Sequence, residues 1–202
     1  MNIHNTLKFI PEYIFCFDVE SVGLYGPAFS VGGGVFNTIT GECFYLFRYT
    51  TDYKKYDLNS IDPSSLEWVK NNIPFLEITH NSIESLRHDF VRFWRELKIK
   101  YPDMIMMADC PFPVETNFLK ECFEHENDKM SLSPYPLIDV SSILLSAGVN
   151  PLETFTRKEY ELPAHDPLND AKQSFRIFIE NIAMVRMALE LYKDTINKYE
   201  SR

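Results

Sequence analysis

Residues 13–23 read Tyr13-Ile-Phe-Cys-Phe-Asp-Val-Glu-Ser-Val-Gly23. An apolar run opens this stretch, and two acids, Asp18 and Glu20, follow it. The apolar residues predict a buried strand. Because side chains two residues apart on a strand point to the same face, Asp18 and Glu20 converge at its end while Val19 turns into the core. Two adjacent carboxylates repel each other unless a cation lies between them, and oxygen ligands suit Mg²⁺ or Mn²⁺. The pattern indicates either a metal site or a solvated acidic strand end.

The rest of the chain alternates between strand and helix patterns. Strands are predicted at residues 28–36 and 42–49, and the turn between them gives an antiparallel meander. Short strands are predicted at 104–108 and 137–138, and helices at 63–70, 81–100, from 113 onward, 140–147 and 167–199. This order predicts an α/β fold with a mixed sheet flanked by helices. Because no repeat or linker interrupts it, residues 1–202 are expected to form a single domain.

A second acidic stretch opens the last predicted helix, where residues 163–171 read Pro-Ala-His-Asp-Pro-Leu-Asn-Asp-Ala. Asp166 suits the N-cap and Pro167 suits the first helical position. His165 then lies just outside the helix and Asp170 within its first turn, so both can face one point in front of the helix end. An imidazole titrates near neutrality and can remove a proton from water. The alternative interpretation is a loop histidine followed by a well-capped helix.

The order of these motifs resembles that of the DEDDh 3′–5′ exonucleases over residues 17–174. Residues 165–171 are similar to that family's third motif almost residue for residue. Residues 61–68, Ile-Asp-Pro-Ser-Ser-Leu-Glu-Trp, resemble a helix start of its small exoribonuclease members, and residues 137–140 resemble the short strand before its last helices. The resemblance implies an RNase H-like fold, in which the first three strands are antiparallel and the later ones parallel.

The sequence departs from this family at the second motif. The family has an Asp at a helix start, three residues before Phe and then Leu or Met, whereas this chain has Glu115-Thr-Asn-Phe-Leu119. Asp109, directly after the strand predicted at 104–108, competes with Glu115 because related RNase H-like nucleases project a carboxylate from that strand end. The two candidates are close to even, with Asp109 slightly ahead because its residue type matches. The other residue is expected to orient the metal ligands.

The resemblance implies hydrolysis with two divalent metal ions, Mg²⁺ or Mn²⁺. The candidate catalytic and metal-binding residues are Asp18, Glu20, Asp109, Glu115, His165 and Asp170. Asp18, Glu20 and Asp170 would hold the ion that activates water, and Asp18 would share the second ion with the acid of the second motif. His165 would accept the proton of the attacking water. The expected product is a nucleoside 5′-monophosphate.

The candidate substrate-binding residues lie close to these motifs. Ser21, Gly23 and Leu24 follow the first acids directly and are expected near the terminal nucleotide, where a glycine permits close approach of the backbone. Leu24 or Phe112 could stack on a base, although such residues more often pack in a protein interior. Arg157, in the loop before the last helix, is a candidate phosphate ligand. The 3′ end of single-stranded RNA is the favoured partner because of the likeness to small exoribonucleases.

The net charge of −9 argues against a tight grip on long nucleic acid but allows an enzyme that holds only a strand end. No apolar run is long enough to span a bilayer and no signal-peptide pattern opens the chain, so we expect no membrane partner and a cytoplasmic location. The four cysteines form no Cys-x-x-Cys pair and are expected to be free and mostly buried. The apolar face of the last helix permits a homodimer.

Other functions stay open from the sequence alone. The chain could be a 3′–5′ exonuclease of single-stranded DNA, or it could act on a small linear or cyclic oligonucleotide. A catalytically weak nuclease fold that only binds is the remaining alternative, because the Asp of the second motif is missing. Dependence on metal separates these classes, since a catalyst needs the ion and a binding module does not.

Overall fold

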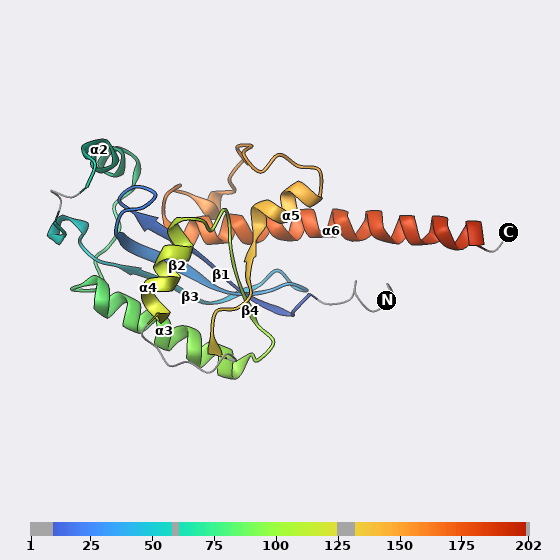
Figure 1. Cartoon of the computed structure of the whole chain (residues 1–202), viewed down its shortest axis with the longest axis horizontal. Coiled ribbons are helices and arrows are strands. Elements are labelled where there is room, and N and C mark those ends of the chain that lie inside the picture. The colour runs from blue at the N-terminus through green and yellow to red at the C-terminus, as the bar shows by residue number, and fades with distance from the viewer. Residues whose placement is uncertain (1–9, 58–60, 125–131, 201–202) are drawn as a thin grey trace.

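The computed structural model describes residues 10–57, 61–124 and 132–200, with side chains described as far as Met184. Figure 1 shows one sheet with helices on both sides. Strands β1 (Tyr13–Ser21), β2 (Ala28–Asn37) and β3 (Cys43–Thr50) are antiparallel neighbours, whereas β4 (Ile105–Ala108) and β5 (Leu137–Asp139) add in parallel, giving the order β3-β2-β1-β4-β5. The predicted mixed sheet, antiparallel first and then parallel, is confirmed.

The helices follow the predicted order. They are α2 (Pro63–Asn72), α3 (Ile83–Lys100), α4 (Val114–Phe123), α5 (Val140–Ser146) and α6 (Pro167–Glu200). Their bounds differ from the predicted ones by two residues or fewer at most ends, because caps and apolar spacing mark helix limits in the sequence. Two short 3₁₀ turns, η1 (Tyr53–Lys55) and η4 (Glu159–Glu161), were not predicted. Figure 1 shows α6 continuing well past the edge of the sheet.

Strand β1 lies at the centre of the sheet and separates two cores. Phe15, Phe17 and Val19 face one side, where they pack with residues of α3 and α4. Ile14 and Cys16 face the other side, where they pack with residues of α5 and α6. Because side chains alternate along a strand, the positions that continue this second face are 18 and 20. The two acids of β1 are therefore directed to the side of the sheet that carries α6.

A glycine in β2 lets the start of α6 approach the sheet. Gly32 pairs with Asp18 across the β1–β2 ladder. A methyl group at Gly32 would lie 2.4 Å from the backbone nitrogen of Leu168, a distance that heavy atoms do not tolerate. The first turn of α6 thus rests on bare backbone next to Asp18. This contact brings Asp170, in the same turn, close to the acids of β1.

The start of α6 is capped as the sequence predicts. The side chain of Asp166 accepts a hydrogen bond from the backbone N–H of Leu168 at 3.1 Å, and its carbonyl accepts one from Asp170 N–H at 2.9 Å. Arg48 of β3 forms an ion pair with Asp166. The cap is thereby tied to the far strand of the sheet, which fixes the direction in which α6 leaves it.

The cysteines were predicted to be free and mostly buried. All four cysteines are free. Only Cys16 and Cys122 are buried, whereas Cys43 on β3 and Cys110 after β4 are exposed, so the expectation of mostly buried thiols holds for two of them. Across the described residues, every helix is too short or too polar to cross a bilayer.

Replacing Gly32 by alanine is expected to destabilise the protein by about 3 kcal/mol, because the added methyl group overlaps the backbone of α6. Gly41→Ala is the matched control: its added methyl meets nothing within 4 Å, and only its left-handed backbone (φ +76°) opposes the change, at about 1 kcal/mol. Urea unfolding monitored by circular dichroism measures both changes. Equal losses for the two variants would show that the close approach of α6 to β2 does not limit stability.

Candidate active site

Strand β1 presents Asp18 and Glu20 at its carboxyl end, on the side of α6. Val19, between them, is 5% exposed and packs in the opposite core, as the alternation predicts. Glu20 is itself only 7% exposed. Two carboxylates are thus held side by side, largely away from water, at the end of a rigid central strand. Such an arrangement is electrostatically costly unless protons or cations compensate for it.

The start of α6 and the loop before it complete a compact cluster with β1. Ligand atoms of Glu20, His165 and Asp170 all lie within 4.8 Å of one another. The backbone N–H of His165 donates to Asp170 Oδ2 at 3.2 Å, and His165 adopts a left-handed backbone conformation with φ 60°. A non-glycine residue in this region is uncommon and is held there by its surroundings. The structure therefore brings together the residues that the two separate sequence motifs predicted.

Arg157 compensates part of the negative charge. Its Nη1 donates to Asp170 Oδ1 at 2.7 Å and to the carbonyl of Glu161 at 3.0 Å. Glu161 is fully buried and accepts hydrogen bonds from Arg176 Nε at 2.6 Å and from Lys158 N–H at 2.8 Å. Because Arg176 belongs to α6, these bonds fasten the loop that carries Arg157 and His165 to the helix that carries Asp170.

The two candidates for the second motif differ in their contacts. Glu115, in the first turn of α4, is 5% exposed and its Oε1 accepts a hydrogen bond from the backbone N–H of Val19 at 3.3 Å. Asp109 instead accepts a hydrogen bond from Ser141 Oγ of α5 at 2.8 Å. Asp109 lies close enough to raise the pKa of Asp18, but Glu115 contributes more to that rise. These contacts favour Glu115, whereas matching residue types slightly favoured Asp109.

The carboxyl groups of this cluster hold their protons more tightly than isolated ones do. Burial, together with the charges of Glu115, Asp170 and Glu20, raises the pKa of Asp18 well above its usual range. Burial and the charge of Asp170 raise the pKa of Glu20 to about 8. Burial raises the pKa of Glu115 to about 7. Burial also raises the pKa of Asp170, although the hydrogen bond from Arg157 opposes the change.

A hollow of about 520 Å³ opens beside Glu20. Its walls come from the end of β1, the segment after it, α2 and the start of α4, and include Ser21, Gly23, Leu24, Ser64, Ser65 and Trp68. The backbone of Gly23 has φ +81°, and a methyl group there would lie 2.7 Å from Ser65 Oγ. Only glycine therefore lets α2 close against the exit of β1. The side chain of Leu24 remains 65% exposed and available to a ligand.

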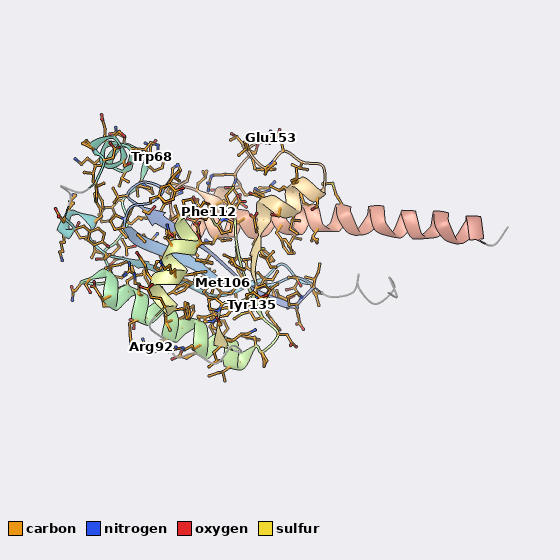
Figure 2. All side chains as sticks on the ribbon, in the orientation of Figure 1. Trp68, Arg92, Met106, Phe112, Tyr135 and Glu153 are labelled. Carbon is orange, nitrogen blue, oxygen red and sulfur yellow. The ribbon has the colours of Figure 1, made fainter. Side chains whose placement is uncertain are left out.

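The remaining predicted substrate-binding residue is Phe112, which Figure 2 labels. Phe112 precedes α4 and is 72% exposed, and it is not among the residues that line the hollow. Trp68, which Figure 2 shows on α2, was not predicted as a site residue. A tryptophan on a short, mostly polar helix was the available signal. Its place in the site depends on how α2 packs, which the helix pattern alone does not show.

The donor set suits hard divalent cations. Asp18, Glu20, Glu115 and Asp170 offer carboxylate oxygens, and His165 adds an imidazole. Oxygen-rich sites bind Mg²⁺ and Mn²⁺ in preference to softer metals. Burial and the neighbouring negative charges raise the pKa values of these acids, and a bound cation would lower them. The residues present therefore fit a divalent metal centre.

Comparison with protein-family models and with curated proteins finds no match to this sequence. Solved structures with the same fold are found. The chain is similar to S. pombe Pop2p in its Mg²⁺- and Mn²⁺-bound form, with a TM-score of 0.58 and 13% identity over 83% of this chain and 81% of that chain. It is also similar to the nuclease domain of 3′hExo, a DEDDh family member, bound to rAMP, with a TM-score of 0.51 and 15% identity over 84% of this chain and 91% of that chain.

A third similar structure shows 3′-end specific recognition of a histone mRNA stem-loop by a 3′-exonuclease. Its TM-score is 0.50 and its identity 14%, over 87% of this chain and 65% of that chain. The sheet order and the flanking helices described above match the RNase H-like fold of these structures. The fold that the sequence motifs implied is thus confirmed.

The metal-free protein is expected to lose stability as the pH rises. Glu20 in the unfolded chain ionises near its ordinary value of 4.5, whereas the folded protein keeps this proton up to about pH 8. Between these values the folded state binds more protons than the unfolded state, so its free energy of unfolding falls with increasing pH. In the presence of chelator, thermal unfolding should therefore show a melting temperature several degrees lower at about pH 8 than at about pH 5.

Glu20→Gln should weaken this pH dependence, because the amide does not titrate. Glu153→Gln is the control, since Glu153 is exposed on the loop after α5 (Figure 2). Added Mg²⁺ should raise the melting temperature more at pH 8 than at pH 5, because ionised carboxylates bind the ion. A metal-free protein that becomes more stable as the pH rises over this range would contradict the described charge cluster.

Proposed function

We propose that this chain is a metal-dependent 3′–5′ exonuclease that hydrolyses the terminal phosphodiester of single-stranded RNA and releases nucleoside 5′-monophosphates. The observation that supports this most strongly is the convergence of Glu20, His165 and Asp170, whose ligand atoms lie within 4.8 Å of one another beside Asp18. Acids from a central strand and a distant helix, together with one imidazole, form the arrangement that metal-assisted phosphodiester hydrolysis requires. The fold shared with known exonucleases agrees with this proposal.

Asp18, Glu20 and Asp170 would hold one divalent ion, and Asp18 with Glu115 a second. Bound Mg²⁺ or Mn²⁺ would act as a Lewis acid that stabilises the negative charge developing on the scissile phosphate. The solved Pop2p structure contains both of these ions. In this chain the carboxylates of β1 and α6 would hold the ions beside His165.

His165 would act as the general base. Its ring would accept the proton of the attacking water, which a neutral imidazole can do near physiological pH. Its backbone N–H donates to Asp170, which holds the backbone of His165 close to a proposed metal ligand. The loop that carries it is fastened to α6 through Glu161 and Arg176, which limits its motion during the reaction.

The hollow beside Glu20 would take the terminal nucleoside. Leu24, exposed on its wall, offers an apolar face to a base, and Ser64 and Ser65 offer hydroxyl groups to a sugar. Arg157 would contact the phosphate once a cation replaces it at Asp170. RNA is the proposed substrate because one similar structure is bound to rAMP and another recognises the end of an mRNA. The net charge of −9 supports a grip confined to the strand end.

The proposal is tested with RNA and DNA strands of one sequence, each labelled at either the 3′ or the 5′ end. With Mg²⁺ or Mn²⁺, 5′-labelled RNA should shorten one nucleotide at a time, DNA should be cut more slowly, and chelator should stop both reactions. Asp18→Asn should reduce kcat by about a thousandfold or more, because it removes a ligand shared by both ions. A pure binding module would retain every strand intact with either metal.

Glu115→Gln and Asp109→Asn distinguish the two candidates for the second motif. We expect Glu115→Gln to lower kcat by about a hundredfold or more and Asp109→Asn by less than about tenfold, because only Glu115 contacts the backbone of β1. Melting temperatures of both variants control for misfolding. The opposite ranking of the two kcat values would assign the second metal to Asp109.

A further inference from the structure

Hydrogen bonds to the described residues do not set the direction of the His165 ring. Its backbone is fixed through the bond from its N–H to Asp170, but this leaves the side chain free to turn about its own bonds. Among the residues that the structure describes, neither ring nitrogen of His165 has a hydrogen-bond partner within the protein. A general base must point at the proton it removes, so the direction of this ring needs a physical cause.

Trp68 contacts that ring. The centroids of the Trp68 and His165 rings are 5.0 Å apart and their planes meet at 80°, which is an edge-to-face arrangement. Edge-to-face pairs are directional, because the positive edge of one ring meets the negative face of the other. Trp68 is 46% exposed and forms part of the wall of the hollow beside Glu20. Trp68 therefore contacts both the ring of His165 and the hollow beside Glu20.

The helix that carries Trp68 is anchored independently of α6. Asp62 caps α2 through a hydrogen bond from Ser65 N–H at 3.0 Å. Val69, next to Trp68, is 1% exposed and packs with Val22 and Phe29 of the β1–β2 region. Because Val22 and Phe29 belong to the sheet side of the site, these contacts fix α2, and Trp68 with it, relative to β1.

We propose that Trp68 is a positioning residue that holds the imidazole of His165 in the direction required for proton removal. This inference rests on the proposed function, since it concerns how the general base is oriented. Trp68 does not touch the reacting atoms itself. Its contribution to the rate passes through His165, and it disappears when His165 is absent.

A double-mutant cycle tests this dependence. In the otherwise unchanged protein, Trp68→Ala should lower kcat on a short RNA by roughly tenfold, which is part of the roughly 10²–10⁴-fold that a general base contributes. Trp68→Phe should restore most of this loss, because it keeps an aromatic edge. In the His165→Ala background, Trp68→Ala should change kcat by less than about twofold. Phe75→Ala is the control, since Phe75 follows α2 and is 94% exposed without contacting His165.

A spectroscopic measurement reports the contact without any activity. In protein with ¹³C-labelled histidine, the His165 resonances are identified by their loss in His165→Ala. An aromatic ring at this distance shifts the imidazole proton signals. Trp68→Ala should therefore move the His165 signals, whereas Phe75→Ala should leave them in place.

The outcomes separate the two proposals. Unmoved His165 signals in Trp68→Ala, or an equal loss of kcat in both backgrounds, would overturn the role of Trp68 while leaving nuclease activity established. A wild-type protein that shows the ring contact but cleaves no substrate would overturn the proposed function, and the positioning role with it. Moved signals together with a loss of kcat that requires His165 support the inference.

Discussion

Carboxylates repel one another most strongly where water is scarce, and the carboxyl end of β1 gathers four of them in such a place. Their pKa values rise because neither solvent nor neighbouring cations fully compensate for the charge. Arg157 forms an ion pair with Asp170 and opposes the rise in the pKa of Glu20, but it does not cancel that rise. The packing of the apolar cores therefore has to hold these acids together against their repulsion. A divalent cation would reduce that repulsion. The same repulsion would favour a bound cation and would lower the stability of the protein without one.

The packing that enforces this arrangement comes from both sides of the sheet. Large aromatic side chains, among them Phe15, Phe17 and Trp94, fill the core on the side of α3 and fix β1 in place. On the other side, bare backbone at Gly32 lets the first turn of α6 approach Asp18. The acids thus meet because two well-packed cores keep β1 from moving, while one missing side chain lets α6 come close.

Local patterns predicted much of this correctly. The apolar run of β1 and the cap at Asp166 each depend on residues that are close together in the sequence. The strand β1, the helix α6 and the common face of Asp18 and Glu20 could therefore be predicted from the sequence. The sequence left Glu115 and Asp109 close to even, because the hydrogen bonds that distinguish them come from distant residues, Val19 for Glu115 and Ser141 for Asp109. Trp68 was missed for a similar reason: the orientation of α2 is set by Val69 packing on Val22 and Phe29.

The residues of the site belong to two parts of the structure, and the buried bond between Glu161 and Arg176 holds the first part together. His165, Arg157 and Asp170 belong to one part, since loop and helix are joined by that bond and by their contacts with Asp170. Asp18 and Glu20 belong to the other, as portions of the sheet. Within each part, hydrogen bonds or strand pairing hold the site residues at short distances from one another. The two parts meet where α6 packs against β1 and β2, and there the first turn of α6 lies on the bare backbone of Gly32. A shift of α6 relative to the sheet would therefore move the helix-borne groups away from the strand-borne ones together.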